Sequence, residues 1–390
     1  MKILCVLSSV SPFGGSSKSF LRLARELTSA QDVEMLVCVP SMGGVCKDLK
    51  LLNNVRIEVL NVRFNVYPNF RSIKDCLLFL PKLIWHFIIN TLAYLQFKKL
   101  AVSYNPDIIH TNVGVVNVGY KVAKILNIPH IYHLREYQDL DFGMKIMPSK
   151  QSFFKQLKRD GNYNICITNG IKEHFNLIGH SNSKVIYNPC FSKSSVCFDR
   201  NKEKYFLFVG RLDEKKGVYD VLESFSKFYV KDKDYKLLLA GVPSDGNMDV
   251  LLKEAKKLGI EAAVDFLGMR NDVFDLMRKA TLTIMASVSE GFGLVTTEAM
   301  MNGCLVVGRD LAGTKEQFDN GLDFIGEEIA LRYQTVEELS NMMVDVAGRG
   351  VESYFEMIEK AQKTVVNFYT IEESAKQVYN FYSEILVGHQ

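Results

Sequence analysis

The sequence predicts an α/β protein with two doubly wound, Rossmann-like domains that face a central cleft. Three observations lead to this prediction. The chain has 390 residues, which is long for one ordinary α/β domain, since domains commonly have roughly 100–200 residues. Short apolar runs alternate with segments of helical periodicity in both halves. A polar stretch without a usable period, residues 188–204, reads as a linker between the two alternations.

The first predicted domain spans residues 1–190. Its strands are expected at 2–8, 33–39, 107–111, 130–134, 164–168 and 184–187. These runs are short, rich in β-branched residues and almost continuously apolar, as strands covered on both faces must be. A helix is expected at 17–28, and the first strand explains the apolar N-terminus better than a signal peptide does.

The second predicted domain spans residues 203–369. Its strands are expected at 205–209, 236–240, 264–267, 282–286 and 304–307. Helical patterns such as 218–229 and 251–258 follow them. Residues 370–390 form an amphipathic helix that is expected to cross back to the first domain, with hinges at the linker and at this return.

The composition indicates a globular, cytoplasmic protein. Hydrophobic residues make up 47% of the chain and charged residues 23%, with a formal net charge of only +3, which gives little support to nucleic-acid binding. The eight cysteines form no Cys-x-x-Cys pair, so we interpret them as reduced core residues without a metal site.

An apolar segment at residues 77–100 raises the question of membrane contact. A proline and several polar residues interrupt it and argue against a bilayer span: Pro81, Lys82, His86, Asn90 and Gln96. Basic and aromatic residues also occur in it, a combination that suits peripheral contact with the inner face of the cell membrane: Lys82, Lys98, Lys99, Trp85, Phe87 and Tyr94. The alternative is a buried helix of the first domain.

A glycine-rich turn at residues 287–300, SVSEGFGLVTTEAM, leads from an apolar strand into a helix. The first amides of a helix lack internal partners and carry partial positive charge, so this turn can face an anion. Glu290 lies in the turn and Glu298 in the helix, where carboxylates can accept hydrogen bonds from sugar hydroxyls. The alternative is a solvated loop acid and an ordinary helix residue.

A second turn of this kind, FVGRLDEKKG at residues 208–217, places Arg211 and Lys216 beyond the end of a strand. Two fixed cations there would stabilise the negative charge that a diphosphate leaving group gathers in a transition state. The alternative, a solvated charged turn, suits residues 213–215 better than it suits Arg211, which directly follows a buried strand and Gly210.

These two motifs, in this order, resemble family 4 of the retaining glycosyltransferases, which have the GT-B fold. The Gly-Arg-Leu turn with its Lys-Gly and the pair of glutamates in EGFG…EA are both present without a gap. The likeness extends to LLLAG, VDFLG and MNGCLVVGRDLAGTKEQF, so it covers nearly the whole C-terminal half.

The resemblance implies roles for individual residues. Arg211 and Lys216 would clasp the donor diphosphate, Glu298 the ribose and Glu290 the donor sugar. Backbone would meet the sugar or phosphate at Phe292, Gly293 and Leu294, and the base at Leu267 to Met269. UDP is the favoured nucleotide, although the turn at residues 240–247 departs from the family pattern and leaves the choice open.

The first domain matches the family less closely. Gly14 and Gly15 follow its first strand, where the family has a glycine pair close to the diphosphate, and a plain turn is the alternative. His133 occupies the place of the family's histidine near the donor sugar and the acceptor hydroxyl, with Arg135 and Glu136 as candidate acceptor-binding residues. His110 is the second histidine candidate.

The expected activity is therefore transfer of a hexose-type sugar from a nucleotide-diphosphate sugar to a saccharide or lipid-linked acceptor, with His133, Glu290, Arg211 and Lys216 as catalytic residues. The family habit suggests surface-polysaccharide synthesis. The departing phosphate would help deprotonate the acceptor hydroxyl. Because no Asp-x-Asp motif lies at a strand end, we expect no metal ion and no other cofactor. A sugar-nucleotide epimerase and a non-catalytic sugar-nucleotide-binding protein are the alternatives.

Overall fold

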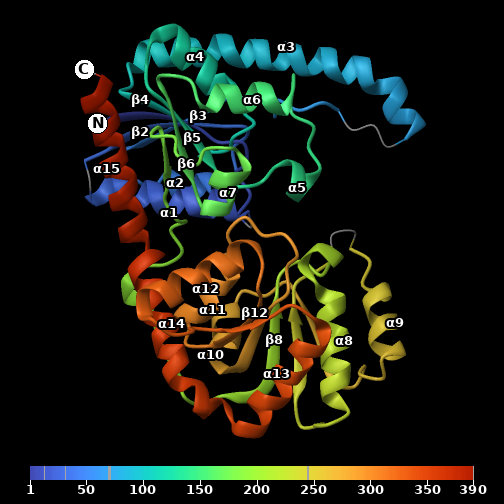
Figure 1. Ribbon diagram of the computed structural model, residues 1–390. Helices are drawn as coiled ribbons and strands as arrows, with labels where there is room; N and C mark the ends of the chain where they lie inside the picture. Colours follow the sequence, from blue (N-terminus) through green and yellow to red (C-terminus); the bar gives the residue numbers. More distant parts are fainter. Residues whose placement is uncertain (13, 31, 69–71, 244–245, 390) are drawn as a thin grey trace. The chain divides into compact units, whose positions relative to one another are not determined.

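A computed structural model of the chain describes residues 1–390 except 13, 31, 69–71, 244–245 and 390. The chain divides into two compact units, one of Met1–Pro189 with Ile371–Gln390 and the other of Cys190–Thr370 (Figure 1). Each unit is a parallel β-sheet with alternating helices, so the predicted fold class of two doubly wound α/β units is confirmed.

The first unit contains a seven-stranded sheet in the order β3-β2-β1-β4-β5-β6-β7 within its described residues. Its strands are β1 (Lys2–Val6), β2 (Glu34–Val39), β3 (Val55–Val59), β4 (Ile108–Thr111), β5 (His130–Leu134), β6 (Asn162–Cys166) and β7 (Ser183–Val185). Its helices are α1 (Gly15–Ala30), α2 (Cys46–Leu49), α3 (Ile73–Tyr104), α4 (Val118–Leu126), α5 (Asp139–Phe142), α6 (Lys150–Leu157), α7 (Asn169–His174) and α15 (Ile371–His389).

Apolar cores lie on both faces of the first sheet. On one face, α1 and α15 pack together against the strands, and on the other α3 and α4 do so. Helix α15 belongs to this unit because residues spaced three or four apart, Ala375, Val378, Tyr382 and Ile385, are buried in the same core as α1.

The second unit contains a six-stranded sheet in the order β10-β9-β8-β11-β12-β13 within its described residues. Its strands are β8 (Glu203–Val209), β9 (Lys236–Ala240), β10 (Val264–Gly268), β11 (Ala280–Met285), β12 (Leu305–Arg309) and β13 (Leu331–Tyr333). Its α-helices are α8 (Val218–Tyr229), α9 (Asp249–Lys257), α10 (Val273–Lys279), α11 (Leu294–Met301), α12 (Ala312–Ile325), α13 (Val336–Arg349) and α14 (Phe355–Phe368). Short 3₁₀ turns occur at Lys193–Ser195, Glu214–Lys216 and Val351–Tyr354.

Helices cover both faces of the second sheet. Helices α8 and α13 pack against each other on one side, whereas α14 contacts α11 and α12 on another (Figure 1). Phe206, Phe225 and Phe228 lie in the core between β8 and α8. This packing holds the ends of β8 and β11, where the functional motifs lie, on a rigid support.

The observed elements extend the predicted ones. Strands β3 and β13 were not predicted, because β3 has a half-exposed edge pattern and β13 has only three residues. Helix α3 is longer than the apolar segment at 77–100 and continues through Pro81. Only its last third is anchored, by the buried residues Ala93, Phe97, Ala101 and Tyr104. Residues 244–245 lie outside the described residues; they belong to the turn at 240–247, whose sequence leaves the choice of nucleotide open.

Candidate functional site

The candidate site of the second unit lies where the strand order reverses. Strands β8 and β11 are neighbours, and β8 connects onward to β9 on one side while β11 connects to β12 on the other. The loops that leave the carboxyl ends of β8 and β11 therefore diverge, and ligands of doubly wound sheets bind in the crevice that such loops leave. These two loops are residues 210–217 and 286–293, which hold the charged motifs found in the sequence.

The loop after β8 is held in shape by its own backbone and by Asp213. The Asp213 carboxylate accepts a hydrogen bond of 3.1 Å from the Lys216 backbone N–H, which fixes the 3₁₀ turn Glu214–Lys216. Gly217 ends this turn at φ +75° and lies so close to β11 that a Cβ atom would be 2.2 Å from the Ala286 carbonyl oxygen. Only glycine fits there, so the lysine turn is pressed against the neighbouring strand end.

Lys216 and Glu290 form an ion pair across the reversal point, between Nζ and Oε2. The Ser287 hydroxyl donates a second hydrogen bond of 3.1 Å to the same carboxylate oxygen. Both charged side chains are about one-fifth exposed, at 23% and 21%, so solvent reaches the pair. The structure thus brings together two residues that the sequence placed in separate motifs.

The start of helix α11 lies directly after Glu290. Gly293 precedes the helix with φ +88°, a left-handed conformation that favours glycine. Gln317 of α12 donates a hydrogen bond of 2.5 Å from Nε2 to the Phe292 carbonyl oxygen, and the Gly313 N–H donates one of 3.0 Å to the Glu290 carbonyl oxygen. Helix α12 therefore holds the glycine-rich turn, while the backbone N–H groups from Leu294 onward start the helix.

The other predicted donor-binding residues lie near the ends of neighbouring strands. The Arg211 side chain is 55% exposed and lies 3.4 Å from Asp213 (Nε to Oδ2). Glu298 lies within α11 and is partly buried. Leu267 and Met269 flank Gly268, whose carbonyl oxygen accepts a 2.9 Å hydrogen bond from the Gly241 N–H. These positions leave the predicted roles as proposals.

In the first unit, Gly14 and Gly15 begin helix α1 beyond β1. The Gly14 N–H donates a hydrogen bond of 3.2 Å to Ser11, and its carbonyl accepts one of 3.0 Å from Lys18. Strands β1 and β4 are neighbours at which the strand order of this sheet reverses. The glycine pair thus occupies the same topological position in the first unit as the Arg211 and Lys216 loop does in the second.

Both histidine candidates lie in one buried polar cluster at the carboxyl ends of β4 and β5. His110 Nε2 lies 3.2 Å from His133 Nδ1, and His110 Nδ1 lies 2.5 Å from the Tyr382 hydroxyl of α15. Arg135 lies 3.3 Å from His133 Nδ1. Burial, followed by the positive charge of Arg135, lowers the pKa of His110 to about 3 and that of His133 well below its usual value of 6.5. Both rings are therefore neutral at pH 7.

Arg135 is a buried hydrogen-bond donor inside this cluster. Its guanidinium donates hydrogen bonds of 2.7 Å to Asn112 Oδ1 and 2.5 Å to Asn188 Oδ1, and the side chain is only 4% exposed. Burial lowers the Arg135 pKa to about 9, which leaves the guanidinium charged at pH 7. The predicted contact of Arg135 with an acceptor remains a prediction, whereas its contacts with Asn112 and Asn188 are observed.

Glu136 and Gln138 follow in the same loop. Burial, helped by the negative charge of Asp141 and opposed by Arg135, raises the pKa of Glu136 to about 7. Gln138 has φ +68° and is 1% exposed, and neither its Oε1 nor its Nε2 has a hydrogen-bond partner among the described residues. The Gln138 amide is therefore a buried polar group whose hydrogen bonds are unmet among the described residues.

Several of the residues that build these sites were missed by sequence reasoning. They are the side chains that support the named candidates: Asn112, Asn188, Ser287, Gln317 and Tyr382. Tyr382 lies on the buried face of the last helix, and no local pattern distinguishes its hydroxyl from that of any other buried tyrosine. Asn112 directly follows β4 and Asn188 lies three residues after β7, and this position beyond a strand is the one sequence signal that could have indicated them.

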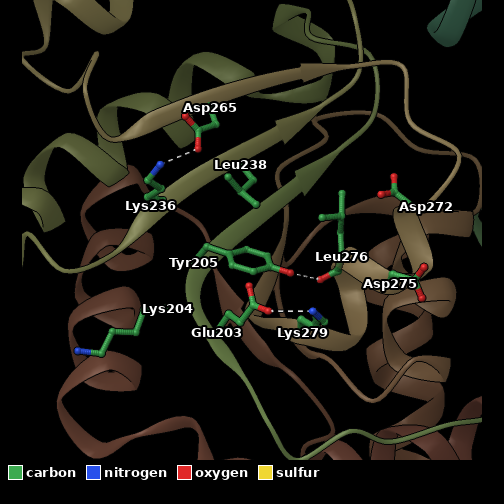
Figure 2. A pocket seen from close by; sticks show the side chains of 10 residues that line it. All are labelled: Glu203, Lys204, Tyr205, Lys236, Leu238, Asp265, Asp272, Asp275, Leu276 and Lys279. Carbon is green, nitrogen blue, oxygen red and sulfur yellow. Dashed lines mark hydrogen bonds and ion pairs between the residues drawn. The ribbon is translucent and has the colours of Figure 1, made fainter.

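A pocket at the opposite edge of the second sheet is separate from these motifs. It lies at the starts of β8, β9 and β10 and beside α10 (Figure 2). Its charged groups pair with one another, as Lys279 does with Glu203 and Lys236 with Asp265, both at 3.0 Å, and the Tyr205 hydroxyl donates to the Leu276 carbonyl at 2.6 Å. Figure 2 shows these three contacts within the lining of the pocket.

The described residues contain no group of three or more His, Cys, Asp or Glu side chains placed to hold a metal ion. All eight cysteines are free, and Cys76 is the exposed one among them.

Comparison with known proteins finds a family match within the second unit. Residues 198–364 match the family described as Glycosyl transferases group 1. N-acetyl-alpha-D-glucosaminyl L-malate synthase of Bacillus anthracis is 31% identical over 176 residues, 43% of this chain and 45% of that protein. A Campylobacter jejuni alpha-1,4-N-acetyl-D-galactosaminyltransferase, named for an undecaprenol-linked substrate, is 32% identical over 157 residues, 38% of this chain and 42% of that protein. The chain thus spans less than half the length of these two relatives.

The crystal structure of Anabaena HepE in complex with UDP superposes with a TM-score of 0.77 at 20% identity, covering 98% of this chain and 100% of that one. HepE has also been crystallised with UDP-glucose. Identity at this level shows a shared fold. Residues 198–364 are thus similar to the group 1 glycosyl transferases, and the two units have the Rossmann-like architecture of the GT-B fold.

Proposed function

We propose that this protein is a retaining glycosyltransferase that takes a hexose-type sugar from a nucleotide-diphosphate donor, with UDP as the favoured nucleotide, and passes it to a saccharide or lipid-linked acceptor. The observation that carries the proposal is the Lys216–Glu290 ion pair at the strand-order reversal of the second unit, beside the start of α11. The UDP and UDP-glucose complexes of HepE support the choice of nucleotide.

The pair has a chemical consequence for a bound donor. A diphosphate that reaches Lys216 competes with Glu290 for the ammonium group, since both are anions. The released Glu290 carboxylate can then accept a hydrogen bond from a sugar hydroxyl. Arg211 and the N–H groups of the first turn of α11 would add positive potential for the leaving diphosphate.

Binding of UDP-, GDP- and ADP-sugars, measured by thermal shift and calorimetry, tests this proposal. Lys216→Ala and Arg211→Ala should each weaken binding of the preferred nucleotide sugar by roughly 10- to 100-fold, because each removes a charged hydrogen-bond donor. Lys215→Ala is the matched control, since Lys215 is an exposed lysine of the same turn. Equal effects of the three variants, or no binding of any nucleotide sugar, would contradict the proposal.

We further propose that helix α3 contacts the inner face of the cell membrane. It is the helix, among the described residues, that is long and apolar enough to cross a membrane by length and composition, and only 11% of its most apolar window is buried. Its first two turns and middle expose large apolar side chains, such as Ile73 (84%), Leu77 (76%) and Trp85 (56%). A lipid-linked acceptor would be presented at that surface.

A further inference from the structure

The polar cluster beneath His133 contains enough hydrogen-bond donors of known direction to determine which ring nitrogen of each histidine carries the proton. A guanidinium has donors only, so Arg135 must donate to His133 Nδ1, and that nitrogen carries no proton. The 3.2 Å contact between His133 Nδ1 and His110 Nε2 then requires the proton to lie on His110 Nε2.

The same reasoning continues to α15. A neutral imidazole has one N–H group and one acceptor nitrogen. Because His110 carries its proton on Nε2, its Nδ1 accepts, and the Tyr382 hydroxyl donates to it at 2.5 Å. The chain of donors therefore runs in one direction, from Tyr382 through His110 to His133.

The end of this chain is His133 Nε2, which must hold the proton of the neutral ring. The residue is only 2% exposed, and this buried atom has no hydrogen-bond partner among the described residues. A buried N–H without a partner is costly, and native proteins seldom leave one unless a ligand or water completes it.

We propose that Tyr382, His110 and Arg135 are positioning residues that hold His133 as an Nε2–H tautomer, so that His133 donates a hydrogen bond to a hydroxyl oxygen of the transferred sugar and does not act as a base. The proposed ligand rests on the proposed function, whereas the tautomer follows from the contacts alone. A tyrosine of the last helix thus sets the hydrogen-bonding character of a histidine that precedes it in the chain by more than two hundred residues.

The tautomer is tested without any activity. In the full-length protein labelled with ¹⁵N-histidine, two-bond ¹H–¹⁵N correlation spectra distinguish a protonated from an unprotonated ring nitrogen, and His133→Asn assigns the His133 signals. We expect His133 and His110 to be protonated at Nε2 and unprotonated at Nδ1. An Nδ1–H tautomer or an imidazolium at His133 would overturn the proposal, whether or not the protein proves to be a glycosyltransferase.

The ligand contact is tested by comparing UDP-glucose with UDP in calorimetry. Tyr382→Phe removes the first donor and should weaken UDP-glucose binding by roughly 3- to 10-fold, the effect of one hydrogen bond, while UDP binding stays unchanged. Tyr379→Phe removes a hydroxyl from the same helix outside the cluster and serves as the matched control. An equal loss for UDP and UDP-glucose, or the same loss in both variants, would overturn the contact with the sugar.

A conservative replacement separates positioning from simple packing. His110→Gln keeps an amide N–H near the position of the imidazole Nε2, whereas His110→Leu keeps bulk without a donor. We expect His110→Gln to retain the His133 tautomer and most of the preference for UDP-glucose over UDP, and His110→Leu to lose both. If the two variants behave alike although both fold, the donor chain does not position His133. If the wild-type chain binds neither UDP nor UDP-glucose, the sugar contact and the UDP assignment fail together, and the spectra alone decide the tautomer.

Discussion

At the scale of single residues, the candidate sites depend on a few side chains and glycines that are fixed by hydrogen bonds or by close contact with neighbouring atoms. Lys216 is positioned because Asp213 caps its turn, and because Gly217 lets that turn approach β11. His133 is positioned because Arg135, just after β5, and His110 on β4 both contact the same ring nitrogen. In both places contacts with neighbouring side chains and backbone restrict what the residue can do.

Gly217→Ala should destabilise the second unit and displace Lys216. Alanine would be strained at φ +75°, and its Cβ would collide with the Ala286 carbonyl oxygen at 2.2 Å. Gly259→Ala is the matched control, because Gly259 has φ +69° but no described atom within 4 Å of the added Cβ. In urea denaturation we expect Gly217→Ala to cost at least about 1 kcal/mol more than Gly259→Ala, which bears only the backbone strain. Equal losses would show that the close approach to β11 is unimportant.

Glu136 should make the protein less stable as the pH rises. Its pKa of about 7 in the folded chain exceeds the ordinary 4.5, so the folded state binds the proton more tightly than the unfolded chain does. The stabilisation is full below pH 4.5 and is lost as the pH rises through 7. Glu136→Gln cannot ionise and should therefore lose less stability than the wild type between pH 4.5 and 8, by at most about 3 kcal/mol.

Urea denaturation of both proteins at several pH values measures this difference. Glu261→Gln is the control, since Glu261 is an exposed carboxylate of the second unit. Parallel stability curves for Glu136→Gln and the wild type would contradict a raised pKa of the partly buried Glu136.

At the scale of elements, helix α3 differs from the other long helices in how little of it is covered. Residues 73–92 contain no fully buried side chain, although they span about 30 Å of helix. Exposed apolar surface of this extent is typical of a binding surface for lipid or protein. The basic residues Lys82, Lys98 and Lys99 lie along the same helix, with Lys82 paired to Asp75 at 2.9 Å.

Charge reversal of Lys82, Lys98 and Lys99 to glutamate should release the protein from anionic vesicles. A basic residue near such a surface contributes about 1 kcal/mol, so binding should fall by at least roughly 100-fold in cosedimentation. Reversal of the exposed Lys233, Lys253 and Lys256 changes the net charge equally and should have little effect. Unchanged binding of the α3 variant would remove the proposal.

At the scale of the whole molecule, the proposed transfer would need donor and acceptor together, and we propose that Arg211 and Lys216 supply the positive charge for the departing diphosphate. We therefore expect sugar transfer to survive EDTA. We also expect free nucleoside diphosphate to appear only when an acceptor is present, which distinguishes a transferase from an epimerase. Full loss of activity in EDTA, restored by Mn²⁺ or Mg²⁺, would contradict metal independence. Interconversion of the nucleotide sugar without an acceptor would contradict the transferase assignment.

Much of the fold could be predicted from the sequence because it depends on local patterns. Continuous apolar runs define buried parallel strands, and glycine and charge at their carboxyl ends define the loops around Lys216 and Glu290. The edge strands β3 and β13 escaped prediction because an edge strand needs only one apolar face or a few residues. The length of α3 escaped it because helix formation continued past Pro81 into residues that no core covers.

The sequence by itself determined two doubly wound units and the charged motifs that we propose bind a sugar nucleotide. Only the tertiary structure decided which of those residues touch: Lys216 meets Glu290 over 74 residues of chain, and His110 meets Tyr382 over 272. The physical reason is that local periodicity sets the burial of a side chain, whereas its hydrogen-bond partner depends on which strands and helices are neighbours. That order is a property of the folded sheet.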